Sequence, residues 1–205
     1  MRGQFITLEG SEGAGKTTNL GFINDYLVNA GLEVLQTREP GGTPLSENIR
    51  EILLGHEYDG MSPDTELLLV FAARAEHLNN KIIPALEQGV TVLCDRFTDA
   101  TYAYQGAGRG IPTEKIAILE NWVQGTLRPD LTIFLDLPVE TGMKRAGERS
   151  EPDRFEKEQI EFFERVRQGY LERTRKEPGR YRVVDASVSL EEVRQQLHKV
   201  LDEFI

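Results

Sequence analysis

Gly10-Ser11-Glu12-Gly13-Ala14-Gly15-Lys16-Thr17 is the stretch from which the fold of this chain can be inferred, because it matches Gly-x-x-x-x-Gly-Lys-[Ser/Thr] at every fixed position. The preceding residues 5–9 are apolar and β-prone. The residues after the motif carry apolar side chains in helical spacing, at Leu20, Ile23, Leu27 and Val28. The motif therefore lies between a predicted strand and a predicted helix, which is the context that its chemistry requires.

The spacing within this motif predicts a phosphate-binding loop. Glycines allow several backbone N–H groups to point at one spot, and the following helix adds its positive end. Lys16 would reach the outer phosphates, and the Thr17 hydroxyl would bind a magnesium ion. The alternative is a glycine-rich turn with an incidental Gly-Lys-Thr, which the flanking strand and helix disfavour. We therefore expect the chain to bind a nucleoside triphosphate.

The composition is that of an ordinary globular protein, with 205 residues of which 39% are hydrophobic and 28% charged. The net charge of -10 argues against a nucleic-acid partner and implies that locally placed arginines capture an anionic ligand. The single cysteine, Cys94, leaves no intrachain disulfide and favours a reducing compartment. No apolar run reaches about 18 residues, and the first predicted strand follows Met1 closely. We expect no membrane span, no signal peptide and a cytoplasmic location.

Four more β-prone apolar runs follow the first strand, and predicted helices separate them. They lie at residues 32–37, 90–94, 131–135 and 181–184. This alternation predicts an α/β fold with a parallel sheet that helices cover on both faces. Ligands then bind beyond the carboxyl ends of the strands, where the sequence places Glu9-Gly10, Arg38-Glu39 and Asp95-Arg96.

Three further segments give expectations that a structure can test. Pro84 should kink or restart the long helix that begins after Ser62. A helix that contains Tyr102 should end in a glycine-rich loop at residues 106–110. Residues 145–158 are densely charged and carry few apolar side chains, so we expect a mobile flap there.

Two pairs of residues suggest specific chemistry. Asp95 and Arg96 follow a buried strand, where the acid could order a magnesium-bound water or contact Lys16 and the guanidinium could grip a phosphate. A surface ion pair at a strand end is the alternative. Phe71 and Arg74 lie three residues apart on one helix face and could stack on a nucleobase and bond its edge. An aromatic residue on an apolar helical face is more often part of the core.

Other polar residues are weaker candidates. Three of them follow Asp95-Arg96 within reach of the same crevice: Thr101, Tyr104 and Gln105. The charged flap contains three arginines, which are Arg145, Arg149 and Arg154. One of them could neutralise a phosphoryl group in transfer while the flap excludes water. The three histidines have no His or Cys partner at metal-ligand spacing, and we assign them no role.

These motifs together resemble the thymidylate kinase family over essentially the whole chain. The resemblance rests on residues 10–18, Arg38-Glu39-Pro40-Gly41-Gly42-Thr43, Asp95-Arg96-Phe97, Ala103-Tyr104-Gln105-Gly106 and Asp153-Arg154-Phe155-Glu156. It implies a P-loop NTPase fold like that of nucleoside monophosphate kinases, with a five-stranded parallel sheet. It also implies one kinase domain over residues 1–205, with a lid at about residues 145–158. The implied reaction is ATP-dependent phosphorylation of dTMP to dTDP with Mg²⁺, by a homodimer.

The resemblance also implies which residues bind each ligand. ATP would be bound by Gly10, Ser11, Glu12, Gly13, Ala14, Gly15, Lys16, Thr17, Thr18, Arg145 and Arg149. The dTMP site would comprise Glu12, Glu39, Pro40, Arg50, Phe71, Arg74, Arg96, Thr101, Tyr104 and Gln105. Magnesium would be bound by Thr17 and Asp95. The catalytic residues would be Lys16, Asp95, Arg96 and Arg149.

Four residues of the implied dTMP site take roles around the base and sugar. Phe71 would stack on thymine, and Arg74 would bond its carbonyl edge. Thr101 would contact the base, and Tyr104 would crowd the sugar so that a 2′-hydroxyl is disfavoured. The roles of Thr101 and Tyr104 come from the resemblance alone.

The implied phosphate chemistry depends on arginine. Arg96 would hold the acceptor phosphate, and Glu12 would meet the 3′-hydroxyl of dTMP. The variable positions of the phosphate loop carry no basic residue. This is the pattern of bacterial relatives that rely on the lid, and it makes Arg149 the catalytic candidate.

Three alternatives stay open at this stage. Another nucleoside monophosphate kinase is the nearest, because one methyl group separates thymine from uracil and some use of dUMP is expected. A GTPase-like switch would carry Asn-Lys-x-Asp, whereas Asn80-Lys81 is followed by Ile82-Ile83. A non-catalytic ATP-binding regulator would have no use for Asp95-Arg96 and an arginine-rich lid.

Overall fold

The computed structural model describes residues 2–147, 154–156 and 158–205. Five parallel strands form one sheet in the order β2-β3-β1-β4-β5. Their bounds are β1 (Phe5–Glu9), β2 (Val34–Arg38), β3 (Thr91–Asp95), β4 (Leu131–Asp136) and β5 (Tyr181–Asp185). The predicted α/β fold with a five-stranded parallel sheet is confirmed. The strand bounds lie within about two residues of the predicted ones, the usual uncertainty of element ends.

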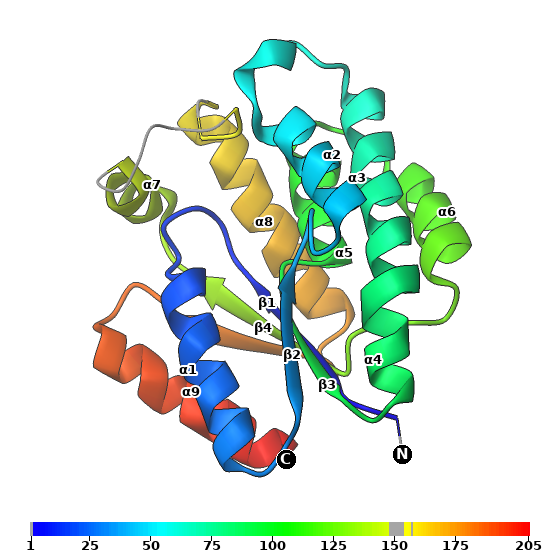
Figure 1. The fold of residues 1–205 in the computed structure, drawn as a ribbon. Helices are drawn as coiled ribbons and strands as arrows, with labels where there is room; N and C mark the ends of the chain where they lie inside the picture. The colour runs from blue at the N-terminus through cyan, green and yellow to red at the C-terminus, as the bar shows by residue number, and fades with distance from the viewer. Residues whose placement is uncertain (1, 148–153, 157) are drawn as a thin grey trace.

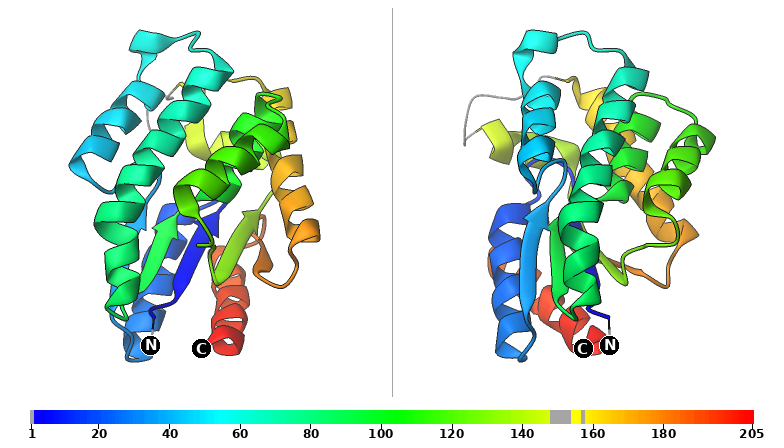
Figure 2. Two further views of the ribbon diagram at one scale, coloured as in Figure 1. Left: turned by 90° about the vertical axis from the view of Figure 1, so that its right-hand side faces the viewer. Right: turned by 45° about the vertical axis from the view of Figure 1, so that its right-hand side comes forward.

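Helices cover both faces of the sheet (Figures 1 and 2). On one face, α1 (Lys16–Asn29) and α9 (Leu190–Phe204) pack against Ile6 and Leu8 of β1. The other face carries α8 (Ile160–Lys176) and the run formed by α3 (Pro63–His77), η2 (Leu78–Ile82) and α4 (Ile83–Glu87). Because side chains alternate along a strand, β1 contributes to both apolar cores.

The carboxyl edge of the sheet is surrounded by the remaining helices of the described chain (Figure 1). They are α2 (Pro44–Leu54), η1 (His56–Tyr58), α5 (Thr98–Thr101), η3 (Tyr102–Gly108), α6 (Thr113–Gln124) and α7 (Val139–Gly147). α2 packs against α3, and η3 packs against α8. These pairs form the walls above the strand ends, where a ligand of a parallel sheet is expected.

The helix that contains Pro84 is interrupted as predicted. α3 ends at His77, a π-helical turn (η2) follows, and α4 begins one residue before Pro84. Proline lacks an N–H and its ring clashes with the carbonyl of the preceding turn, so a regular helix cannot pass through it. The wider turn of a π-helix accommodates that defect.

The glycine-rich loop predicted at residues 106–110 is partly wrong. α5 continues into the π-helix η3, which includes Gly106 and Gly108. A Cβ atom on Gly108 would lie 2.6 Å from the ring of Phe162 in α8. The absence of a side chain there is what allows α8 to approach η3 closely, so these glycines are packing residues of a helix and not loop breakers.

The charged segment 145–158 is helical at its start and packed near its end. Arg145 belongs to the last turn of α7, and Arg154 and Phe155 are buried. Arg149 lies outside the described residues. The lid therefore stays a prediction.

In the described part of the chain, no helix has the length and apolarity needed to cross a membrane.

Candidate active site

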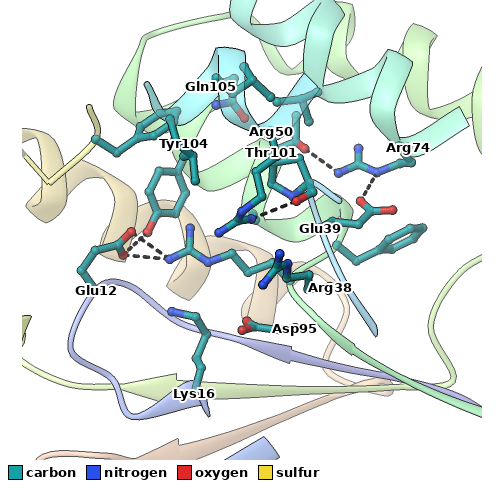
Figure 3. A pocket seen from close by; sticks show the side chains of 18 of the residues that line it. Glu12, Lys16, Arg38, Glu39, Arg50, Arg74, Asp95, Thr101, Tyr104 and Gln105 are labelled. Carbon is teal, nitrogen blue, oxygen red and sulfur yellow. Dashed lines mark hydrogen bonds and ion pairs between the residues drawn. The ribbon is translucent and has the colours of Figure 1, made fainter. Parts of the chain in front are cut away.

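A cavity of about 290 Å³ lies at the carboxyl edge of the sheet (Figure 3). The phosphate loop, the ends of β2 and β3, and helices α2, α3, α5 and η3 supply its walls. Most of the predicted site residues line it: Glu12, Gly13, Lys16, Thr17, Glu39, Pro40, Arg50, Arg74, Asp95, Arg96, Thr101, Tyr104 and Gln105. Figure 3 shows Glu12 and Lys16 towards one side of this cavity and Glu39 and Arg74 towards the other.

The phosphate loop has the conformation that its glycines permit. Gly13 and Gly15 have φ values of 70° and 82°, which side chains disfavour. α1 begins at Lys16, so its first N–H groups face the loop. The Lys16 ammonium donates to the carbonyl oxygens of Gly10 at 2.9 Å and Ser11 at 3.0 Å. Burial and the neighbouring Arg96 guanidinium lower the pKa of Lys16.

Asp95 and Thr17 are the candidate ligands for a metal ion at this site. Oδ1 of Asp95 is buried and has no hydrogen-bond partner in the described part of the chain, and both side chains line the cavity. Magnesium in nucleotide sites is held by one or two protein ligands together with phosphate oxygens. Within the described residues, no group of three His, Cys, Asp or Glu side chains is arranged to hold a metal alone. The donor set therefore fits a magnesium ion that arrives with a nucleotide.

Arg96 is held in a strained backbone conformation. Its φ of 66° is the only positive value at a non-glycine residue in the described chain. Its N–H donates to the Leu8 carbonyl at 3.0 Å, and the next amide, of Phe97, donates to Oε1 of Glu9 at 2.7 Å. These bonds to β1 turn the Arg96 side chain into the cavity.

The Arg96 guanidinium meets a carboxylate there. Nη2 lies 2.9 and 2.8 Å from the two oxygens of Glu12, and the Tyr104 hydroxyl donates to the same carboxylate at 2.5 Å. Burial would raise the pKa of Glu12, but Arg96 and Lys16 together outweigh it and lower the pKa. An ionised Glu12 holds the Arg96 guanidinium through Nη2 and leaves its other N–H groups able to bind a phosphate.

The Arg74 guanidinium has one nitrogen without a hydrogen-bond partner in the described part of the chain. Its Nε donates to Oε2 of Glu39 at 2.7 Å, and Nη2 donates to Oγ1 of Thr101 at 3.0 Å. Its guanidinium carbon lies 4.7 Å from the ring centre of Phe71 and 5.1 Å from that of Phe97. Nη1 is buried and has no partner in the described part of the chain. With Nε and Nη2 bonded to Glu39 and Thr101, Nη1 is the nitrogen of this guanidinium that is left to bind an acceptor.

Several predicted residues of the described chain do not line the cavity: Gly10, Ser11, Ala14, Gly15, Thr18, Phe71 and Arg145. Phe71 is 2% exposed and packs in an apolar cluster of α3, η3 and α6, with its ring against Arg74. Arg145 donates to the Ala186 carbonyl at 2.8 Å, beyond the end of β5. The stacking role of Phe71 and the ATP contact of Arg145 stay predictions.

The structure adds wall residues that the sequence analysis did not assign: Arg38, Leu53, Leu54, Val70, Phe97, Ala100, Phe155 and Glu156. Arg38, Phe97, Phe155 and Glu156 lie within motifs quoted for the family resemblance, and that proximity was the available signal. The others are apolar helix residues, whose sequence pattern resembles that of any core position.

Comparisons with known proteins point in one direction. A family model described as "Thymidylate kinase" matches residues 8–197. The thymidylate kinase of Pseudomonas syringae pv. tomato is 60% identical over 205 residues, covering 100% of this chain and 98% of the relative. That of Pseudomonas putida F1 is 59% identical over 201 residues, covering 98% and 96%. A crystal structure of thymidylate kinase from Ehrlichia chaffeensis superposes with a TM-score of 0.79 at 35% identity, covering 98% of this chain and 99% of the other.

Proposed function

Because this chain belongs to the thymidylate kinase family, we propose that it transfers the γ-phosphoryl group of ATP to dTMP and releases dTDP and ADP. The observation that carries this proposal is the shared cavity of Lys16, Arg96 and Arg74. A phosphate-loop lysine, a second phosphate-binding arginine and a base-reading arginine in one cavity fit a donor triphosphate and an acceptor nucleotide placed side by side.

The base of dTMP would be read by Arg74. Its unpartnered Nη1 fits a carbonyl oxygen, since a guanidinium donates only. The hydroxyl of Thr101 is held by Nη2 of Arg74 and supplies a second polar contact beside the base. Phe71, one helical turn away, is proposed to lie along the base once dTMP is bound. Gln105 lines the same wall and would close the pocket around the ring.

The sugar and acceptor phosphate would lie between η3 and the phosphate loop. Arg96 would bind the 5′-phosphate, and Glu12 would accept a hydrogen bond from the 3′-hydroxyl. Tyr104, fixed by its bond to Glu12, would leave no space for a 2′-hydroxyl. Arg50, whose Nη1 donates to the Pro40 carbonyl at 2.9 Å, would add positive charge to the same end of the cavity.

The donor would occupy the phosphate loop. Its N–H groups and the positive end of α1 would hold the phosphates of ATP, and Lys16 would exchange the carbonyls of Gly10 and Ser11 for the outer phosphate oxygens. Thr17 and Asp95 would hold magnesium. That ion supplies neutralisation of phosphate charge and no covalent chemistry. Placement and charge stabilisation do most of the work in phosphoryl transfer, and the protein groups are arranged for those two tasks.

The lid would complete the site. We propose that Arg149 crosses to the transferring phosphoryl group and that Arg145 contacts ATP from the end of α7. An arginine at that place contributes about 10³–10⁵ in rate in related phosphoryl-transfer enzymes. Closure would also exclude water and so favour transfer to dTMP over hydrolysis.

We further propose that the chain forms a homodimer through α3 and α6. Three large apolar side chains are exposed there: Leu68 at 56%, Ile118 at 67% and Trp122 at 80%. The two helices pack side by side (Figure 1). Large apolar side chains exposed on two neighbouring helices are typical of a protein interface. Light scattering tests this proposal: Trp122→Lys should yield monomers, and an unchanged mass would contradict it.

A cytoplasmic location is proposed on the chemistry of the chain. Its one cysteine is buried and free in β3, and ATP and dTMP are intracellular metabolites. Fractionation of cells that produce the protein would test this proposal.

A coupled assay tests the reaction itself. Production of ADP is measured with ATP and each of dTMP, dUMP, UMP, CMP and GMP as acceptor. We expect dTMP to give the highest kcat/KM and dUMP a lower but measurable value, because one methyl group contributes only about 1–3 kcal/mol in a pocket. Robust turnover of another monophosphate with none of dTMP would refute the proposal.

A further inference from the structure

A buried chain of hydrogen bonds runs from β2 to Arg74 through a histidine to which the sequence analysis assigned no role. His77, at the end of α3, is fully buried. Its Nε2 lies 2.7 Å from Oγ1 of Thr37, and its Nδ1 lies 3.1 Å from Oε1 of Glu39. The other oxygen of Glu39 accepts the 2.7 Å hydrogen bond from Nε of Arg74. The imidazole therefore connects β2 to Arg74 through Glu39.

The partners of the imidazole define how its hydrogens are arranged. A carboxylate can only accept, so Nδ1 of His77 donates to Glu39. In the neutral ring, Nε2 then accepts from the hydroxyl of Thr37, and both nitrogens are satisfied. The loop backbone lies against the ring, since a Cβ atom on Gly42 would lie 2.4 Å from Nε2. The ring has no room to turn away from its two partners.

This arrangement fixes the orientation of the Glu39 carboxylate. With one oxygen on His77 and the other on Arg74, the carboxylate cannot rotate without breaking a buried hydrogen bond. Thr101 and the rings of Phe71 and Phe97 hold the remaining edge and the faces of the Arg74 guanidinium. The orientation of the Arg74 guanidinium is thus set by the groups that contact it, and His77 acts on it through Glu39.

We propose that His77 is a positioning residue for base recognition. It holds Glu39 so that Arg74 presents Nη1 to a ring carbonyl, and it thereby disfavours a base with an amino group at that position. The proposal rests on the proposed function, because it takes dTMP as the acceptor. His77 itself contacts neither substrate and is not a wall residue of the cavity.

Two polar variants separate the two sides of the imidazole. The side-chain amide of His77→Asn falls near Nδ1 of the histidine and can still donate to Glu39. The amide of His77→Gln reaches the position of Nε2, so it keeps the contact with Thr37 and loses the one with Glu39. Both variants replace the imidazole with one side-chain amide. A difference between their KM values for dTMP therefore reports the contact with Glu39.

The experiment measures kcat and KM for dTMP, for ATP and for 5-methyl-dCMP, which carries an amino group where thymine has a carbonyl. For His77→Gln we expect KM for dTMP to rise about tenfold, in line with the loss of a buried hydrogen bond to a charged group. We expect kcat and KM for ATP to stay within about twofold. Discrimination between dTMP and 5-methyl-dCMP should fall by about the same factor. His77→Asn should stay within about threefold of the unmodified protein in every parameter.

Equal behaviour of the Asn and Gln variants would overturn the proposal, as would a rise in KM for ATP that matches the rise for dTMP. Thermal unfolding checks that both variants fold. If His77→Gln does not fold, His77→Met takes its place, because a thioether fills the space of the ring and offers Glu39 no N–H donor. KM for dTMP should again rise about tenfold, and a KM within about threefold of that of the unmodified protein would reject the role of His77. An unmodified protein that does not use dTMP would instead refute the proposed function.

Discussion

The hydroxyl of Tyr104 lies 2.5 Å from Oε2 of Glu12. The guanidinium of Arg96 contacts the same carboxylate, and its central carbon lies 4.7 Å from the centre of the Tyr104 ring. The three side chains come from η3, the phosphate loop and the residue after β3. Each of them therefore holds the other two in place. An acceptor phosphate bound by Arg96 would bring its sugar against the tyrosine ring.

Tyr104 is expected to separate deoxyribose from ribose through its ring and not its hydroxyl. Tyr104→Phe should raise KM for dTMP about three- to tenfold, because Glu12 loses a hydrogen bond, and should keep the preference for dTMP over its ribonucleotide counterpart. Tyr104→Ala opens the space and should lower that preference about tenfold or more. The measurement is kcat/KM for both nucleotides on both variants. Equal preferences in the two variants would contradict this assignment.

Lys16 is expected to act on the donor phosphates alone. Lys16→Met should lower kcat about 10²–10³-fold, the usual effect of removing a preorganised donor, and leave the Kd for dTMP within about twofold by calorimetry. Lys16→Arg should not restore activity, because a planar fork does not replace a compact ammonium in the loop. The prediction fails if dTMP binding is lost in parallel with kcat.

The two lid arginines are expected to differ in effect. Arg149→Ala should lower kcat about 10³-fold or more without a change in thermal stability. Arg145→Ala should mainly raise KM for ATP, because Arg145 lies at the end of α7 and is held by the Ala186 carbonyl. Steady-state kinetics of the two variants test this, with Arg175→Ala, at the end of α8, as a matched control. A similar loss of kcat in the Arg175→Ala control would show that the effect is not specific to the lid.

Glu9 predicts a pH dependence of stability. Burial and the nearby Asp99 raise the pKa of Glu9 to about 8 from 4.5. Between these two values the folded protein holds a proton that the unfolded chain has released, so stability falls as pH rises through this window and levels off above it. Glu9→Gln cannot ionise. Relative to the unmodified protein, its free energy of unfolding should increase by about 1.4 kcal/mol per pH unit across the window.

Urea unfolding of both proteins at several pH values between about 5 and 8 measures this difference. Glutamine retains an oxygen for the Phe97 amide, so its basal fold should be preserved. A difference between the two proteins that does not depend on pH would show that Glu9 is already ionised in the folded state.

Most of the fold could be predicted because its signals are local. The five strands are continuous β-prone runs, and Pro84 and the phosphate-loop glycines each impose a backbone preference that needs no tertiary information. The helical course of Gly106 and Gly108 could not be predicted in this way. Glycine often ends a helix, but here Gly106 faces Ile116 of α6 and Gly108 faces Phe162 of α8, and these tertiary contacts are not visible in the local sequence.

The position in the cavity wall could be predicted for Lys16 from the phosphate-loop motif, and for Asp95 and Arg96 from their place at the end of β3. The site was not predictable where a role depends on a partner distant in sequence. His77 contacts Thr37 and Glu39 from another element, and spacing gives no indication of that contact. For Phe71 the sequence predicted the neighbour correctly, because its ring lies against Arg74. The ring nevertheless does not line the cavity.

A crystal structure with dTMP and a non-hydrolysable ATP analogue tests the central claim most directly. We expect the 5′-phosphate of dTMP at Arg96, the thymine carbonyl within hydrogen-bond distance of Nη1 of Arg74, and the terminal donor phosphate at Lys16. A complex in which dTMP binds away from Arg96, or turns its base away from Arg74, would contradict the account.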